Sequence, residues 1–188
     1  MQKALYTSFA SFILIIRSLL LLSLPSEAIS GTIPETGASL PSFQLSSPTN
    51  ENDLSYLGLK SPDFYLKDID CQVLLVEIIG IYCSRCYQQA PLFNRLFSRL
   101  NKKGMEDKVK MLAVAAGATD NEVEHVRSDG TYAFPVVKDE PYAVHKLLGE
   151  PRTPFTMLVA KDGRVLFAHL GVIEDVDALF EQIRNLVK

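Results

Sequence analysis

Residues 73–86, with the sequence VLLVEIIGIYCSRC, decide the fold of this chain of 188 residues. The run from Val73 to Ile79 consists of β-branched residues and leucines, and one acid, Glu77, interrupts it. Such a run is typical of a strand buried on both faces of an α/β sheet. Apolar residues at helical spacing follow from Cys86 to Leu100. The stretch therefore predicts a central strand that leads directly into a helix.

The rest of the chain continues this alternation of strands and helices. Short apolar runs predict further strands at 64–66, 109–116, 134–137, 155–160 and 165–170. An Asp-Gly pair at 162–163 predicts a hairpin between the last two strands. Apolar periodicity predicts helices at 121–127, 142–148 and 176–187. We therefore expect one α/β domain, residues 55–188, with a mixed central sheet flanked by helices.

The composition excludes several classes of protein. Hydrophobic residues make up 47% and charged residues 22%, which is typical of a folded chain rather than a disordered one. The net charge of -3 and the lack of a basic run argue against nucleic-acid binding. Three cysteines are too few for a disulfide framework, so any role for them must be inferred from their spacing.

The N-terminal 28 residues predict export from the cytoplasm. Residues 4–24 are almost entirely apolar or small, and Ser26 and Ala28 supply the small residues of a signal-peptidase site after Ala28. An uncleaved membrane anchor through residues 4–24 is the alternative, although Arg17 within the run disfavours a span. Either reading places the body in the periplasm, outside the cell or tethered to the inner membrane. Residues 29–54, rich in Ser, Pro, Thr and Gly up to Thr49, are expected to form a flexible lead-in.

The chemistry is expected at Cys83-Ser84-Arg85-Cys86, which follows the buried strand and opens the helix. Two cysteines three positions apart on a first helical turn can close a local disulfide. The helix N-terminus favours a thiolate at Cys83, and the intervening Ser84 and Arg85 are candidates for tuning its pKa. An accessible thiolate of low pKa is what thiol–disulfide exchange requires. A purely structural disulfide and half of a zinc site are the alternatives, but no second ligand pair with zinc spacing accompanies the cysteines.

The stretch 73–86 resembles the active-site strand and helix of the thioredoxin superfamily. Pro91 matches the proline within that helix, and Thr153-Pro154 resembles the segment whose cis-proline faces the dithiol. Residues 61–66 and 134–139 resemble the N-terminal strand and the βα insertion of the TlpA-like branch. The resemblance covers about residues 55–188 and implies a thioredoxin-like fold and an exported thiol–disulfide oxidoreductase. Tyr82 stands where the family usually has Trp.

The resemblance also implies the roles of individual residues. Cys83 would attack a disulfide of a partner protein and Cys86 would resolve the mixed disulfide. Glu77, six positions before Cys83, matches a buried acid that would manage the proton of Cys86. An irregular strand that exposes Glu77 at a sheet edge is the alternative. Tyr82, Thr153 and Pro154 would dock the partner backbone.

No metal or organic cofactor is implied, and electrons would pass to or from another dithiol protein. Two other functions share the fold. A copper-delivery protein of the Sco type would use both cysteines and His169, but that family separates its cysteines by three residues. A peroxiredoxin-like peroxidase would need Pro and Thr where this chain has Val76 and Gly80. Cys71 is read as a structural thiol or, alternatively, as a third redox partner.

Overall fold

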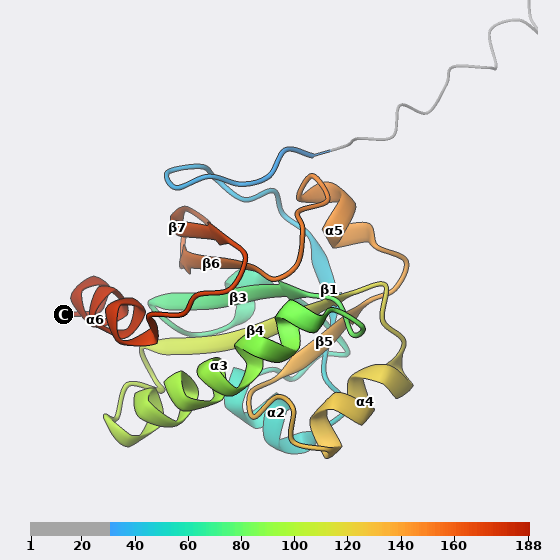
Figure 1. Cartoon of the computed structure of the whole chain (residues 1–188), viewed down its shortest axis with the longest axis horizontal. Coiled ribbons are helices and arrows are strands. Elements are labelled where there is room, and N and C mark those ends of the chain that lie inside the picture. Colours follow the sequence, from blue (N-terminus) through green and yellow to red (C-terminus); the bar gives the residue numbers. More distant parts are fainter. Residues whose placement is uncertain (1–30) are drawn as a thin grey trace, which may run out of the picture.

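The computed structural model describes residues 31–188 and contains a five-stranded mixed sheet (Figure 1). The strands lie in the order β5-β4-β3-β6-β7. Strand β3 pairs in parallel with β4 and antiparallel with β6, so it occupies the centre. The strands are β3 (Val73–Ile79), β4 (Val109–Ala116), β5 (Val136–Asp139), β6 (Phe155–Ala160) and β7 (Val165–Leu170). The predicted central strand and the predicted mixed sheet are both confirmed.

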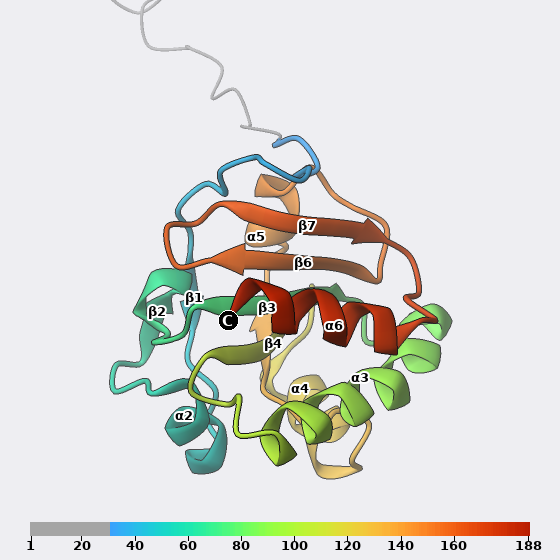
Figure 2. The same cartoon turned by 90° about the vertical axis from the view of Figure 1, so that its left-hand side faces the viewer.

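Helices cover both faces of the sheet (Figure 2). Helices α3 (Ser84–Lys102), α4 (Asp120–Ser128) and α6 (Val176–Leu186) contribute to the core on one face. Helices α2 (Glu51–Leu57) and α5 (Ala143–Leu147) contribute to the core on the other. A two-stranded ribbon of β1 (Gln44–Ser46) and β2 (Asp63–Tyr65), followed by the 3-10 turn η1 (Leu66–Asp68), also packs there.

The alternation of side chains along β3 explains this three-layer arrangement. Every residue of β3 is buried, because successive side chains point to opposite faces and both faces are covered. Leu75 and Ile79 belong to the core beneath α3 and α6. Leu74 and Ile78 belong to the core beneath the ribbon and α5. Glu77 shares the parity of Leu75, which places its carboxyl under α3 beside the active-site turn.

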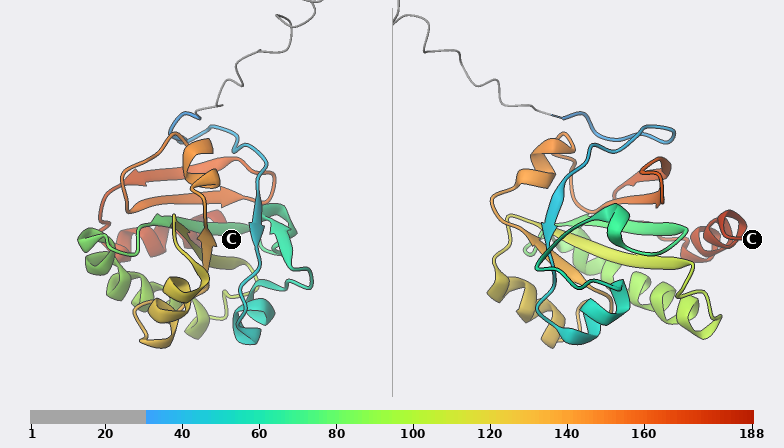
Figure 3. Two further views of the ribbon diagram at one scale, coloured as in Figure 1. Left: turned by 90° about the vertical axis from the view of Figure 1, so that its right-hand side faces the viewer. Right: turned by 180° about the vertical axis from the view of Figure 1, so that it is seen from behind.

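The structure corrects the expected flexible lead-in for the part of it that is described. Residues 37–40 run antiparallel to the start of β7, where Gly37 N donates to Val165 O at 2.8 Å and Val165 N donates to Ala38 O at 2.8 Å. Figure 3 shows this N-terminal segment lying over the β6–β7 hairpin. Phe43 and Leu45 then enter the core. Backbone pairing and two buried apolar side chains therefore anchor a segment whose composition resembles that of a linker.

The sequence also missed helix α2, which lies at the end of that segment. Its seven residues are too few to show an apolar period. The helix forms because the Asn50 side chain accepts hydrogen bonds from the backbone N–H groups of Asn52 and Asp53. Gly58 ends it in the left-handed conformation. The helix is thus defined by its two capping residues, whereas the prediction relied on apolar periodicity.

The signal or anchor predicted for residues 1–28 lies outside the described residues. Within residues 31–188, none of the helices is both long enough and apolar enough to cross a membrane.

Candidate functional site

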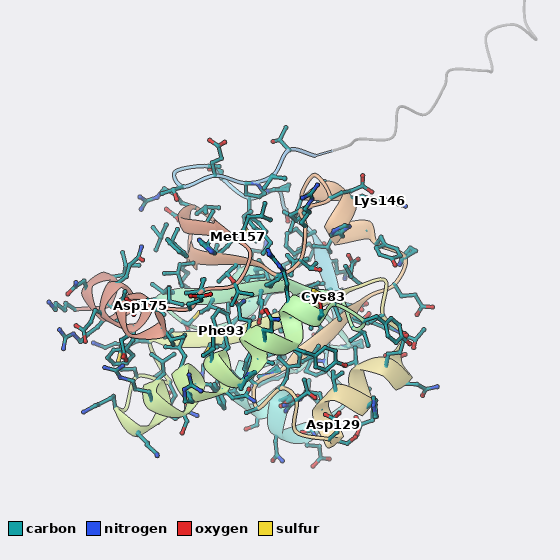
Figure 4. All side chains as sticks on the ribbon, viewed as in Figure 1. Cys83, Phe93, Asp129, Lys146, Met157 and Asp175 are labelled. Carbon is teal, nitrogen blue, oxygen red and sulfur yellow. The ribbon has the colours of Figure 1, made fainter. Side chains whose placement is uncertain are left out.

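The two cysteines of the candidate site lie at the start of α3, just after the turn that follows β3. Cys83 is the residue that caps the helix, and its Sγ accepts a hydrogen bond from the backbone N–H of Cys86 at 3.2 Å. Figure 4 shows Cys83 at the N-terminal end of α3, near the middle of the molecule. Within residues 31–188 no cysteine is in a disulfide, so the structure corresponds to the reduced dithiol.

The surroundings of Cys83 favour its thiolate. Partial burial alone would raise the pKa of Cys83, but hydrogen bonds from the Cys86 side chain, the Thr153 side chain and the backbone N–H groups of Cys86 and Arg85 outweigh it. The net result is a pKa below the ordinary value for cysteine. Unpaired N–H groups at a helix N-terminus provide this kind of stabilisation for an anion. Cys83 is also partly exposed, so a partner molecule can reach it.

Cys86 has the opposite properties. It is 1% exposed, and burial together with its hydrogen bond to Cys83 raises its pKa to about 12. At neutral pH Cys86 therefore remains a protonated thiol, and its S–H donates a hydrogen bond to the Cys83 sulfur. One accessible thiolate and one shielded thiol, three residues apart, form an asymmetric pair.

The loop before β6 lies against Cys83. The Thr153–Pro154 peptide bond is cis, as the resemblance to the thioredoxin superfamily implied. The Cys83 thiol lies 3.4 Å from the carbonyl oxygen of Thr153. Gly171 N donates to the Pro154 carbonyl at 2.8 Å, which ties this loop to the end of β7. The predicted docking residues Thr153 and Pro154 are thus adjacent to the accessible cysteine.

Glu77 is fully buried, which excludes the alternative of an exposed acid at a sheet edge. Burial raises its pKa to about 8, although a hydrogen bond from Gln89 lowers it in part. Gln89 Nε2 donates to Glu77 Oε1 at 2.7 Å, and it also lies 3.3 Å from Thr156 Oγ1. The amide oxygen of Gln89 accepts from the backbone N–H of Ile173 at 2.7 Å. Gln89, one turn after Cys86 on α3, therefore holds the carboxyl in place, and burial keeps its pKa well above the ordinary value.

The sequence analysis missed Gln89 and Thr156, which complete this buried polar group. A signal for Gln89 was available: it lies three residues after Cys86, on the face of α3 that otherwise carries apolar residues. Thr156 carried no such signal, because threonine is common in strands. Only the pairing of β6 with β3, which sets Thr156 opposite Glu77, brings it to the site.

Of the three predicted residues Tyr82, Ser84 and Arg85, only Arg85 influences the pKa of Cys83. Tyr82 is 87% exposed, and its hydroxyl donates to Glu122 Oε1 at 2.8 Å, so it stands at the rim of the site. Arg85 contributes through its backbone N–H, while its guanidinium points toward Gly171. Ser84 is not among the groups that shift the pKa of Cys83.

Cys71 and His169 are not brought to the dithiol as additional ligands or thiols. Cys71 is buried just before the opposite end of β3, in the core of the other face. Seven strand residues span about 20 Å, whereas a disulfide requires Cα atoms within about 7 Å. Among residues 31–188, no three His, Cys, Asp or Glu side chains are grouped closely enough to hold a metal ion. His169 instead stacks beside Phe167 on β7.

The fold and the dithiol define a member of the thioredoxin superfamily with a thiol–disulfide site at a helix N-terminus. Residues 35–183 match the model of the Redoxin family, and the chain belongs to that family. It is similar to the thiol-disulfide oxidoreductase ResA of Bacillus thuringiensis subsp. konkukian (strain 97-27). The two are 28% identical over 120 residues, 58% of this chain and 67% of the relative. ResA of Geobacillus thermodenitrificans (strain NG80-2) is 27% identical over 140 residues, 68% of this chain and 78% of the relative.

A solved structure shares the fold. The crystal structure of a putative thiol:disulfide interchange protein DsbE from Chlorobium tepidum superposes with a TM-score of 0.64 at 22% identity. The superposition covers 82% of this chain and 99% of that one. The predicted TlpA-like member of the thioredoxin superfamily and its thiol–disulfide oxidoreductase class are confirmed.

Proposed function

We propose that this chain works outside the cytoplasm and exchanges disulfides with other proteins through Cys83 and Cys86. The observation that carries the proposal is the asymmetry of the two thiols: Cys83 is accessible with a lowered pKa, and Cys86 is buried with a pKa of about 12. Exchange needs one thiolate that attacks the partner disulfide and a second thiol that stays protonated until it resolves the mixed disulfide. The apolar, signal-like residues 4–24 support the location, whether they are removed or serve as a tether.

The exchange would proceed in two displacements. The Cys83 thiolate attacks a sulfur of the partner disulfide, which forms a mixed disulfide and releases the other partner sulfur as a thiolate. Cys86 then loses its proton to the Glu77 carboxylate and attacks the Cys83 sulfur. This closes the Cys83–Cys86 disulfide and frees the partner as a dithiol. An upstream dithiol protein would restore the reduced pair, or the sequence would run in reverse.

Partner recognition would use the loop that lies against Cys83. The Thr153 carbonyl is already 3.4 Å from the Cys83 sulfur, so an extended partner segment paired with this backbone brings its own cysteine to the nucleophile. Tyr82 offers an exposed aromatic ring at the same rim.

Trapping of a partner tests this function directly. Cys86→Ser should form a stable mixed disulfide with a disulfide-containing protein, and mass spectrometry should place the link at Cys83. The unaltered chain should turn over the same partner without accumulating the complex. A complex that persists in a Cys83→Ser variant would contradict the proposal.

Measurement of the reduction potential would give the direction of electron flow. A value near the roughly -270 mV of thioredoxin indicates a reductase, and one near roughly -120 mV indicates an oxidant. Copper titration and peroxide consumption, each with Cys83→Ser as control, test the two alternative functions. Tight copper binding or rapid peroxide turnover without disulfide exchange would replace the proposal.

A further inference from the structure

Two buried polar atoms on the side of the sheet that α3 covers have no hydrogen-bond partner among residues 31–188. One is Glu77 Oε2, the second oxygen of the acid already described. The other is the hydroxyl of Tyr132, a residue that is 3% exposed and that the proposed exchange does not yet use. Buried hydroxyl groups are normally hydrogen-bonded, so an unpartnered one in a well-packed core needs an explanation.

The position of Tyr132 connects it to Cys86. Both residues line one narrow cavity, which has no room for a water molecule and which Gly80, Ile81, Tyr87 and Val126 complete. Both also belong to the core beneath α3. Tyr132 is firmly held there: its N–H donates to Val126 O at 3.1 Å, and its carbonyl accepts a hydrogen bond from Arg127. Arg127 in turn forms a bidentate pair with Asp53 of α2.

The groups that act electrostatically on the Tyr132 hydroxyl are all part of the site or beside it. Burial raises the pKa of Tyr132 far above its ordinary value, and negative charge on Glu77, Cys86, Cys83 and Tyr87 raises it further. The only nearby cation described above, Arg127, binds the backbone of Tyr132 and is already paired with a carboxylate. The hydroxyl therefore remains an O–H donor over the whole range in which the site titrates.

We propose that the Tyr132 hydroxyl is a hydrogen-bond donor held for the thiolate of Cys86, and that it accelerates the resolution of the mixed disulfide. In the reduced chain Cys86 is a neutral thiol, which is a weak acceptor, and the Tyr132 hydroxyl has no hydrogen-bond partner among residues 31–188. Once Cys83 is bound to a partner sulfur, Cys86 must ionise inside the core. A donor already fixed beside the place where charge develops stabilises that charge without reorganisation.

The proposal rests on the proposed exchange function. It does not change where the proton and the electrons of that exchange go. The proton of Cys86 goes to the Glu77 carboxylate, and the two electrons of the dithiol go to the partner disulfide. Tyr132 donates a hydrogen bond to the Cys86 sulfur and loses no proton. The proposed role is thus a hydrogen bond to a reacting atom during resolution, and it differs from that of the proton acceptor Glu77.

Ellman's reagent separates the two displacements in one experiment. Attack by Cys83 on the reagent releases one thionitrobenzoate, and resolution by Cys86 releases the second. The parent protein should carry Cys71→Ala, so that only the pair reacts. In Tyr132→Phe the first release should be unchanged, and the second should slow by about tenfold to a hundredfold, the usual effect of one hydrogen bond to a charged group. The pH midpoint of the second release should move upward.

Folding stability separates this role from a structural one. Removing an unpartnered buried hydroxyl should leave the free energy of unfolding of Tyr132→Phe unchanged or increased. Tyr56→Phe is the matched control, because the Tyr56 hydroxyl accepts a hydrogen bond from Met111 N at 2.9 Å. That variant should lose stability while both releases keep their rates.

A second release by Tyr132→Phe that matches the parent at every pH would overturn the proposal. So would an equal slowing of the second release in Tyr56→Phe. If the parent protein releases no thionitrobenzoate at all, the proposed exchange function fails, and the role of Tyr132 fails with it.

Discussion

Cys71 and Cys83 lie beyond the two ends of the same strand, β3, in very different surroundings. Cys71 precedes the strand and lies in the core of the face covered by the β1–β2 ribbon, where burial raises its pKa to about 11. Cys83 follows the strand at the N-terminus of α3, and its pKa is lowered. At the first end no helix begins, and the one backbone N–H group that lowers the pKa of Cys71, that of Lys110, does not outweigh burial. The same element thus supports an inert thiol at one end and a reactive one at the other.

The two thiols differ in burial and in the number of hydrogen-bond donors that face them. A hydrogen bond from the backbone of Lys110 and the charges of Lys110 and Lys161 lower the pKa of Cys71, yet burial dominates. Lys161 is also engaged with Asp70 at 2.7 Å. Cys83 is lowered by hydrogen-bond donors, backbone N–H groups among them, that point at the sulfur. Directed donors are worth more to a thiolate than exposed, solvent-screened ammonium groups.

Matched removal of each thiol should give the largest difference. Cys83→Ala should abolish disulfide exchange, because no other accessible thiolate lies at the site. Cys71→Ala should retain the full exchange rate, since about 20 Å of strand separate it from the pair. Turnover of a disulfide-containing protein measures both. Loss of exchange in Cys71→Ala would show that the two ends are chemically connected.

Glu77→Gln should have the next largest effect, on the dithiol end alone. Loss of the base that accepts the Cys86 proton should slow the resolving step by about a hundredfold. Attack by Cys83 should keep its rate, because the helix N-terminus sets that thiolate. The two releases from Ellman's reagent measure these steps separately. Equal rates for both steps in the variant and the parent would remove Glu77 from the mechanism.

The same variant should change how stability depends on pH. Burial raises the pKa of Glu77 from 4.5 to about 8, so between these values the folded chain holds a proton that the unfolded chain has lost. The unaltered chain should therefore lose stability as the pH rises through this range, by up to about 1.4 kcal/mol per pH unit. Glu77→Gln should lack this loss and be the more stable protein above the range. Denaturant unfolding at several pH values checks the sign, and parallel curves for the two proteins would contradict it.

Alkylation should resolve all three thiols of the reduced chain. Near neutral pH, iodoacetamide should label Cys83 alone, because the thiolate is the reacting form. Cys86 and Cys71, with pKa values of about 12 and about 11 and little exposure, should be labelled only after unfolding. Peptide mapping by mass spectrometry distinguishes the three sites. Comparable labelling of Cys86 or Cys71 in the folded chain would contradict the prediction that Cys83 alone is reactive.

Arg85→Gln should have the smallest effect. The backbone N–H of residue 85 remains in the variant, and that group is the part of Arg85 that acts on Cys83. The pKa of Cys83 should rise by less than about one unit, the scale of an exposed charge pair. Thiolate absorbance followed against pH in a Cys71→Ala background measures it. A larger rise would give the guanidinium a direct role in activating Cys83.

The sequence was most informative where burial and periodicity coincide. The apolar run of β3 and the helical spacing after Cys86 predicted the centre of the fold, and Glu77 stood out as one acid among apolar residues. The N-terminal region was misread, because β1 and α2 are held by tertiary contacts and short caps. The partners of Glu77 also escaped, since Gln89 and Thr156 meet only when α3 packs on β3 and β6.

Arg85 and Ser84 illustrate a different limit of sequence reasoning. Their place between the cysteines suggested an influence of their side chains on the pKa of Cys83. In the structure the influence belongs to the backbone N–H of residue 85, a group that nearly every residue type supplies. A role carried by the main chain leaves no mark on the choice of amino acid, so composition alone could not reveal it.

The pairing of residues 37–40 with β7 has a consequence for the solubility of the protein. β7 is an outer strand of the main sheet, and an open strand edge recruits extended segments of other molecules. The N-terminal segment already occupies the start of that edge. An extended segment of another molecule therefore cannot pair with the backbone at that point. Residues 37–40 thus protect this part of the sheet edge against strand pairing between molecules, the contact from which aggregation starts.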